Sequence, residues 1–437
     1  MARTNHSRLW PWILLGLVGC LWLTGCRKAA PTSVSFMIFG DPAEKAAYDQ
    51  LVIAFKAKHA DIDVQEIYIP SDGDYRTRLA TDFAAGSPPD IALMNYRRIA
   101  AFAAKDQLEP LGPYLADSDI VQPDDFYPIA LEAFTWQGEV VCIPQNVSSL
   151  VVYYNEKLFD AAGLPYPADD WTWDDFLTTA QALTQDSNGD GQMDQFGLGI
   201  AASLYRLAPF IWQNNGELVD MLEAPRQLAL TRFPSLTALE WFTSLQTVHH
   251  LAPSRVEETA QDSESRFVAG TLAMFFNSRR VVPAFREITA FTWDVAPLPR
   301  GEFAASILHS DGYCLSAAAK NKDAAWAFIE FANSAEGQTI IAGTGRTVPS
   351  LKAVAESAAF LNPGQAPSRS AVWLDAIPNL HHVPILAQWA EIESVADEEI
   401  ERAFYGEITP LEAAQNAKWR TEEYFLLSQQ PTPAPTP

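Results

Sequence analysis

Tryptophan side chains stand beside amide-bearing residues at two points of this chain. Trp136 precedes a Gln-Gly pair, and Trp212 comes shortly before Asn214 and Asn215. An indole ring can cover an apolar C–H face, and amide groups can pair with hydroxyl groups in a dry cleft. With 13 tryptophans in the chain, these pairs predict a site for a small polyhydroxyl ligand such as a sugar. Core packing is the alternative for each tryptophan taken singly.

Amide and charged side chains at strand ends and in turns extend this candidate site. The further candidates are Asp41, Asn277, Arg279, Asp311, Gly312 and Arg346. Their carboxylates, amides and guanidinium groups can hydrogen-bond sugar hydroxyls. The adjacent Arg279 and Arg280 would also admit an acidic or phosphorylated ligand. The alternatives are a turn or cap role for Asn277 and the aspartates, and a surface salt bridge for Arg279.

A short acidic loop has the ligand spacing of a calcium-binding loop. Residues 186–194 place side-chain oxygens at the first, third, fifth and ninth positions, glycine at the sixth and a backbone carbonyl at the seventh. The predicted ligands are Asp186, Asn188, Asp190, Gln192 and Asp194. Gly197 occupies the twelfth position, where a full loop has a bidentate glutamate. A glycine-rich acidic turn without an ion is therefore the alternative. Any calcium would be structural, and no other cofactor is expected.

Motifs of enzyme catalysis are missing from the sequence. It contains no G-x-S-x-G or H-E-x-x-H, no phosphate-binding loop, and no G-x-G-x-x-G after a strand. The pairs at 249–250 and 381–382 are adjacent histidines, and neighbouring positions on a helix point in different directions. We expect a binding protein rather than an enzyme. A secreted carbohydrate-active enzyme is the alternative, because 54 acidic residues always allow a catalytic carboxylate pair to be imagined.

The N-terminus predicts export and a lipid anchor. Arg3 and Arg8 precede an apolar stretch that is too short to span a bilayer comfortably and has the form of a signal peptide. The stretch ends in Leu-Thr-Gly-Cys, the form of a bacterial lipobox, with Cys26 as the lipidated residue. Lipid chains on Cys26 would hold the protein on the extracytoplasmic side of the cell envelope. An ordinary secretory signal is the alternative.

Length and composition favour two lobes and exclude one class of partner. Removal of residues 1–25 leaves 412 of the 437 residues, more than one core usually organises. The chain has a net charge of −24, so it would repel nucleic acid. Cys142 and Cys314 both lie in apolar runs, and we expect two buried thiols, with a disulfide as the alternative. Residues 26–33 are expected to be a linker, and the Pro-Thr-rich residues 429–437 a disordered tail.

Strands and helices alternate along the chain, as in α/β proteins. Apolar runs at 34–39, 64–69 and 90–94 predict three strands, with two helices between them that carry apolar residues at every third or fourth position. Ligands bind such open sheets at the carboxyl ends of the strands. Further strands are predicted at 140–143, 151–154, 271–276, 291–296 and 312–316, and the last hundred residues are mainly helical.

Four regions of the sequence resemble the extracellular solute-binding proteins of family 1, the maltose- and glycerol-phosphate-binding kind. Residues 83–90 resemble the family's small-residue turn before a strand, and 138–144 with 153–159 resemble its "GIP … YYN" core. Residues 171–176 resemble its "TWDEL" helix start, and 267–274 its "G-x-A-A-M" strand entry. These segments occur in family order across most of the chain.

The resemblance implies a periplasmic-binding-protein fold, a Venus flytrap of two α/β lobes that close on a small carbohydrate and dock on an ABC transporter permease. We expect residues 34–144 plus about 297–345 to form one lobe, and about 145–296 plus 346–428 the other. A monomer is expected. The family often has "N-G-x-W" where this chain has Asn277 followed by Ser-Arg-Arg, which leaves an anionic ligand open. A sensor rather than an importer is the alternative partner.

Overall fold

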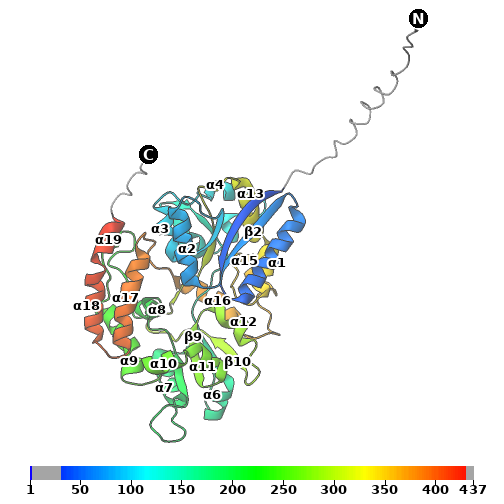
Figure 1. Ribbon diagram of the computed structural model, residues 1–437. Coiled ribbons are helices and arrows are strands. Elements are labelled where there is room, and N and C mark those ends of the chain that lie inside the picture. Colours follow the sequence, from blue (N-terminus) through cyan, green and yellow to red (C-terminus); the bar gives the residue numbers. More distant parts are fainter. Residues whose placement is uncertain (2–30, 430–437) are drawn as a thin grey trace.

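The computed structural model describes residues 1 and 31–429 and has two α/β lobes, one above the other in Figure 1. The first sheet has the strand order β2-β1-β3-β12-β6. Its strands are β1 (Thr32–Phe39), β2 (Ile62–Ile69), β3 (Ile91–Asn95), β6 (Cys142–Pro144) and β12 (Asp311–Leu315). The first three strands are parallel, and β12 runs antiparallel to both β3 and β6. The predicted β-α-β-α-β order of the first hundred residues is confirmed.

Helices on both faces of this sheet complete the first lobe. They are α1 (Pro42–Lys58), α2 (Asp72–Ala84), α3 (Tyr96–Ala103), α13 (Lys322–Ala332), α14 (Ala335–Gly343) and α15 (Lys352–Ala355). Helix α1 begins as its sequence predicts, because Asp41 accepts a hydrogen bond from the Glu44 amide and proline occupies the first turn. Its buried face, which includes Leu51 and Phe55, packs in a core with α13 and α14.

The second lobe is built on a sheet with the order β10-β7-β9-β8. Its strands are β7 (Val151–Asn155), β8 (Phe196–Gly199), β9 (Leu272–Asn277) and β10 (Trp293–Ala296). Its longer helices are α6 (Glu156–Ala162), α7 (Trp173–Leu183), α8 (Leu204–Gln213), α9 (Phe233–Thr247), α17 (Trp389–Phe404), α18 (Pro410–Arg420) and α19 (Glu422–Ser428). Helix α17 packs on α8 and α9 and also reaches α3 of the first lobe.

The remaining elements are short. They are α4 (Gly112–Ala116), η1 (Pro123–Asp125), α5 (Pro128–Ala133), β4 (Thr135–Trp136), β5 (Glu139–Val140), α10 (Arg255–Ala260), α11 (Ser263–Ala269), η2 (Arg279–Val281), α12 (Val282–Phe285), β11 (Ser306–Ile307), α16 (Ala371–Ala376), η3 (Ile377–Asn379) and β13 (Leu380–His381). Among the described residues, no helix has both the length and the apolar character needed to cross a bilayer.

Three segments of chain pass between the lobes and are hydrogen-bonded to one another. The Val147 amide donates to the Val348 carbonyl over 2.9 Å. Ser148 and His309 exchange two backbone hydrogen bonds of 2.8 Å each. The crossings therefore form a small antiparallel ribbon, which fixes the relative position of polar side chains that lie far apart in the sequence.

The expectation of two free thiols is wrong, because Cys142 and Cys314 form a disulfide. Strands β6 and β12 are antiparallel neighbours, and their register places the two cysteines directly opposite each other with Cα atoms 4.3 Å apart. This distance suits the closer type of antiparallel pair. The sequence could not show the pairing, because 172 positions separate the two residues.

Some expected segment boundaries also differ from the structure. Strand β1 begins at Thr32, so it includes the last two residues of the expected 26–33 linker. Leu351 and Val354 pack in the core of the first lobe and α15 packs on α14, although 346–428 was assigned to the second lobe. Gln429 still caps α19. The rest of the expected tail, the signal peptide and Cys26 lie outside the described residues.

Candidate functional site

A cavity of about 660 Å³ lies where the crossings meet the carboxyl ends of β1 and β3. The first lobe supplies most of its lining, from the ends of β1 and β3, from the first turn of α1, and from residues along α2 and α3. The crossings add Gln145, Asn146, Ser148 and His309, and the second lobe adds Ser278, Arg280 and the start of α17. This volume falls in the range of about 300–1,000 Å³ found for small-molecule sites.

Aromatic rings form an apolar part of this cavity. Phe39 at the end of β1 and Tyr75 on α2 have ring centroids 4.8 Å apart. Phe102 on α3 lines the same space. The Tyr75 hydroxyl donates to the Leu93 carbonyl over 2.7 Å, which fixes its ring. Tyr75 is buried and supports Phe39, whereas Phe39 and Phe102 are partly exposed and can stack on the C–H face of a ligand.

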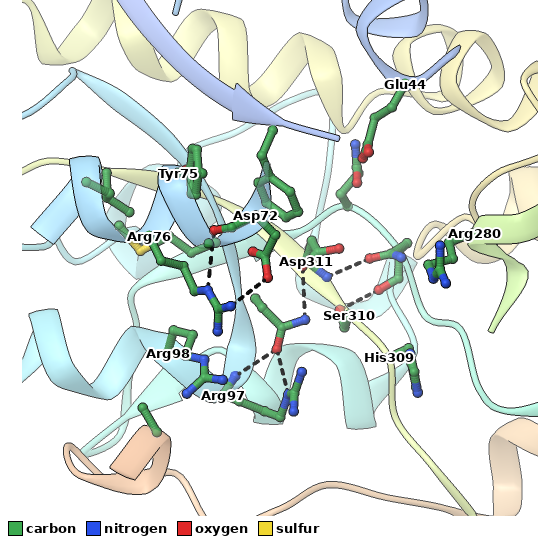
Figure 2. Close-up of a pocket in the computed structure, with 18 of the residues that line it drawn as sticks. Glu44, Asp72, Tyr75, Arg76, Arg97, Arg98, Arg280, His309, Ser310 and Asp311 are labelled. Carbon is green, nitrogen blue, oxygen red and sulfur yellow. Dashed lines mark hydrogen bonds and ion pairs between the residues drawn. The ribbon is translucent and has the colours of Figure 1, made fainter. Parts of the chain in front are cut away.

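One wall of the cavity is formed by α2 and by the ends of β3 and β12, and we call it the first-lobe wall. Its polar side chains contact one another. It consists of Asp72, Arg76, Asn95 and Asp311. Asp72 and Arg76 form an ion pair of 3.1 Å, and the Asn95 amide donates to Asp311 over 3.0 Å. Burial raises the pKa of Asp311, and the Asn95 hydrogen bond opposes this rise. In Figure 2 the Asp311 side chain lies near the middle of the cavity.

Arg97 connects this wall to the second lobe. Its Nε donates to Asn95 over 3.1 Å, its guanidinium lies 3.9 Å from the centre of the Tyr205 ring, and it pairs with Glu393 of α17. Arg98 lies 4.0 Å from the other oxygen of Glu393. Burial lowers the pKa of Arg98, although Glu393 opposes this effect. The two arginines thus hold α3 against α17 at the floor of the cavity.

A second group of charges ties α1 to the last crossing. Arg346 pairs with Asp41 and lies 2.7 Å from Glu44. Burial raises the pKa of Glu44 to about 7, and the coulombic attraction of Arg346 works against this shift. Gly40 has a φ of +127°, and a Cβ there would collide with the Glu44 carboxyl group. This position therefore requires glycine.

The crossings and the second lobe present a different set of groups, which we call the hinge cluster: Ser148, Arg206, Arg280 and His309. Arg206 of α8 contacts His309 Nε2 and Asn277 Oδ1, each over 3.2 Å. Burial, with Arg206, Arg97 and Arg280 nearby, lowers the pKa of His309 well below its ordinary value. Arg280 also lines a second cavity of about 420 Å³, so it lies between the two spaces, whereas Arg206 lines only the second one.

The sequence identifies the protein family directly. Residues 40–339 match the family described as bacterial extracellular solute-binding protein. This chain belongs to that family. It is therefore an extracellular solute-binding protein and not an enzyme, and the alternative of a carbohydrate-active enzyme is withdrawn.

Relatives of this solute-binding protein extend over most of its length. A binding protein of Brucella abortus (strain 2308) is 21% identical over 403 residues, which cover 90% of this chain and 94% of the relative. The structure of the ABC substrate-binding protein Lmo0181 from Listeria monocytogenes in complex with cycloalternan has a TM-score of 0.83 and 25% identity, covering 90% of this chain and 99% of that one. The GacH receptor of Streptomyces glaucescens has a TM-score of 0.77 and 22% identity, and the match covers 92% of this chain and 100% of the receptor chain. These matches confirm the predicted two-lobed periplasmic-binding-protein fold.

Four of the residues predicted from the sequence lie in or beside the two cavities. Asp311 and Arg346 line the main cavity, and Asn277 lines the second one. Asp41 caps α1 and pairs with Arg346. Asn277 is buried, and its side-chain oxygen accepts from Arg206 and from the Ser278 amide.

The prediction that Arg279 contacts ligand is wrong. Arg279 is 1% exposed, and its guanidinium lies 4.4 Å from the Phe360 ring centre and 4.6 Å from that of Trp373. It donates to Ser370 over 3.2 Å. Gly312 also lies away from the cavity, because a Cβ there would meet the Phe134 ring at 2.8 Å. Both residues pack the interior of the solute-binding protein.

The expectation of indole rings in the cleft is also wrong for the described residues. Trp136 is half-buried in β4. The Trp212 ring stacks on that of His381, with ring centroids 4.8 Å apart. The Asn214 side chain donates to the Pro234 carbonyl, and Asn215 is an exposed residue with a φ of 57°. None of these four lines either cavity. Ten of the 13 tryptophans are described, and none of these lines either of the two cavities; the other three lie in the predicted signal peptide.

The loop at 186–194 folds around its own backbone amides. Asp186 accepts from the amides of Gly189 and Gly191, and Asp194 accepts from that of Ser187. Asn188 and Asp190 accept amides two residues further on. In the described part of the chain, no three His, Cys, Asp or Glu side chains are grouped to share a metal ion. The calcium site therefore stays a prediction.

Sequence reasoning missed most of the polar lining, although one signal was present. Asn95, Arg97 and Arg98 directly follow the third predicted strand. Ligands bind at the carboxyl ends of the strands in open sheets of this kind. If this rule is applied to the third strand as well as to the first, it selects these three residues. Glu44 and Asp72 occupy first turns of helices, where an acid is usual for capping alone. Nothing in the sequence separates these two from ordinary caps.

Proposed function

We propose that this protein captures a small carbohydrate in the interlobe cavity and delivers it to the permease of an ABC transporter. The observation that carries the proposal is the combination of aromatic rings with hydroxyl-pairing groups in one cavity at the lobe boundary. Phe39 and Phe102 supply apolar faces, and Asp311, Asn95 and Arg76 supply hydrogen-bonding groups. Carbohydrates present both kinds of surface, so this lining suits them.

The known ligands of similar proteins support this proposal. The Listeria protein was crystallised with cycloalternan and the Streptomyces receptor with acarbose and an acarbose homologue. The Listeria protein is called an ABC substrate-binding protein, which supports a permease as the partner.

A thermal-shift screen of mono- and oligosaccharides, polyols and glycerol phosphates tests this function. A ligand that binds only the folded form raises the melting temperature, by an amount that grows with concentration. At least one carbohydrate is expected to produce this shift. If only amino acids, peptides or metal ions raise the melting temperature, the carbohydrate assignment is wrong.

We further propose that lipid on Cys26 anchors the protein at the outer face of the membrane. The Leu-Thr-Gly-Cys sequence at 23–26 supports this proposal. Expression of the full chain in a bacterial host should give a membrane-bound form with a diacylglyceryl mass on its N-terminal cysteine. The Cys26→Ser variant should be released from the membrane. A wild-type protein cleaved elsewhere and free of lipid would contradict the anchor.

A further inference from the structure

The hinge cluster presents hydrogen-bond donors to the cavity with few acceptors among them. A guanidinium group can only donate, so His309 Nε2 must accept the hydrogen bond from Arg206. A neutral imidazole that accepts at Nε2 carries its proton on Nδ1. No described residue accepts a hydrogen bond from that Nδ1–H. His309 therefore has a free donor in a side chain that lines the cavity.

Ser148 supplies a second unused group beside it. Its side chain is 3% exposed, and its hydroxyl has no hydrogen-bond partner among the described residues, although the residue lines the cavity. A buried hydroxyl without a hydrogen-bond partner destabilises the folded protein. Its backbone is fixed by the two hydrogen bonds to His309 in the crossing ribbon. The group is therefore held ready for a ligand atom.

The charge around these two residues is positive and only partly balanced. The charged groups that act on His309 are Arg206 of α8, Arg97 of α3 and Arg280 of η2. Within the described residues no ion pair joins Arg206 to a carboxylate, although Glu258, Asp262 and Glu264 line the second cavity with it. The pKa of Arg206 is lowered to about 10, chiefly by burial. Arg280 pairs with the partly exposed Glu264 through one nitrogen over 2.6 Å. Figure 2 places Arg280 and His309 on the same side of the cavity.

A neutral sugar does not match this arrangement well. Each of its hydroxyl groups is both a donor and an acceptor, so it needs carboxylate or carbonyl acceptors as well as donors. An anionic group only accepts, and it gains more from each charged or neutral donor that points at it. It would also offset the arginines. The first-lobe wall, which includes Asp72 and Asp311, retains the acceptors that hydroxyl groups require.

We infer that the hinge cluster binds an anionic substituent of the ligand, a carboxylate or a phosphate, and that the solute is an acidic or phosphorylated carbohydrate. The inference rests on the proposed carbohydrate-binding function and specifies its ligand class. Arg280 and His309 contact the anion, Ser148 donates to it, and Arg206 acts as a positioning residue that fixes the imidazole tautomer.

Isothermal titration with matched sugar pairs tests the inference. Digalacturonic acid is compared with galactobiose, and glucose 6-phosphate with glucose, so that the carboxylate and phosphate sources are measured separately. At least one anionic member is expected to bind about tenfold or more tightly than its neutral partner, because charge-assisted hydrogen bonds are the stronger ones. Raising the salt concentration should narrow this difference.

The variant Arg280→Gln removes one charge from a side chain that is 51% exposed, so it should fold. It is expected to lower the anionic affinity about tenfold and the neutral affinity by a much smaller factor. His309→Asn and Ser148→Ala should act in the same direction. Arg300→Gln is the matched control, because Arg300 is an exposed arginine that lines neither cavity.

Equal affinity for both members of each pair, or loss of neutral and anionic binding alike in Arg280→Gln, would overturn the anion assignment and leave the carbohydrate function intact. If none of the four sugars nor any member of the wider carbohydrate screen binds to the folded protein, the proposed function itself fails. The two failures are therefore distinguishable.

Discussion

The first-lobe wall and the hinge cluster face the same cavity but differ in how their charges are balanced. On the first-lobe wall, Asp72 pairs with Arg76, and Asn95 donates to Asp311. In the hinge cluster, Arg206 contacts an imidazole and an amide rather than a carboxylate, and the Ser148 hydroxyl has no partner in the described residues. The comparison shows that a list of polar lining residues does not define the charge of the ligand. The groups that have no partner within the protein are the ones that indicate this charge, because they are free to bind the ligand.

The two regions also differ in how firmly their elements are joined. Asp311 begins β12, which is covalently tied to β6 by the Cys142–Cys314 disulfide. The hinge cluster draws its residues from crossings, α8 and η2, which hydrogen bonds and packing hold together. One strand of the first-lobe wall is therefore held by a covalent link that the hinge cluster lacks, and the following predictions test this difference and the difference in charge.

The largest expected effect is on stability. A variant with both Cys142→Ser and Cys314→Ser should lose about 4 kcal/mol of unfolding free energy, because the disulfide closes a long loop in the unfolded chain. Urea unfolding followed by tryptophan fluorescence measures this loss. Reduction of the wild-type protein is the control and should lower stability similarly. The ratio of anionic to neutral affinity should survive in the folded variant, since the hinge cluster is untouched.

Replacement of the central acid of the first-lobe wall should weaken every carbohydrate ligand. Asp311→Ala removes a buried acceptor, and about a 100-fold loss of affinity is expected for neutral and anionic sugars alike. Titration calorimetry measures both. Asp61→Ala, which removes an exposed acid outside the cavities, is the control. A loss of affinity for anionic ligands alone would contradict the proposal that the first-lobe wall binds hydroxyl groups and the hinge cluster binds the anionic group.

The pair Arg279 and Arg280 shows how far the sequence could predict this site. Both follow β9, yet η2 turns Arg279 into an aromatic core and leaves Arg280 on the cavity. The succession of strands and helices in the first hundred residues, the cap of α1 and the family resemblance were predictable because they depend on local patterns such as Asp41-Pro42. The disulfide and the hinge cluster were not, because they depend on register between segments more than a hundred residues apart.

Acidification should leave anion binding at the hinge cluster almost unchanged. Burial and three arginines hold the pKa of His309 well below its ordinary value, so the imidazole is neutral above this pKa. In that form it accepts from Arg206 at Nε2 and can donate its Nδ1–H to the anion. A second proton would have to occupy Nε2, which faces the Arg206 guanidinium 3.2 Å away. Binding therefore requires no proton uptake at His309.

Digalacturonic acid titrated between pH 8 and 5.5 tests this expectation, because its carboxylates stay ionised across the range. Its affinity should change by less than about twofold, as should that of galactobiose. His309→Asn should lower the anionic affinity at every pH without changing the slope. Calorimetry in two buffers of different ionisation enthalpy would detect a proton directly. Proton uptake on binding in the wild-type protein but not in His309→Asn would contradict the tautomer that Arg206 is inferred to fix.

The smallest effect is expected from the loop at 186–194, which belongs to neither region. None of its residues lines a cavity, so treatment with EDTA should leave the dissociation constant of a carbohydrate within about twofold. If the loop binds calcium as its spacing predicts, adding the ion should raise the melting temperature, because an ion that binds only the folded form stabilises it. Asp186→Asn should abolish this rise. A change in ligand affinity that follows calcium would show that this distant loop is coupled to the cavity.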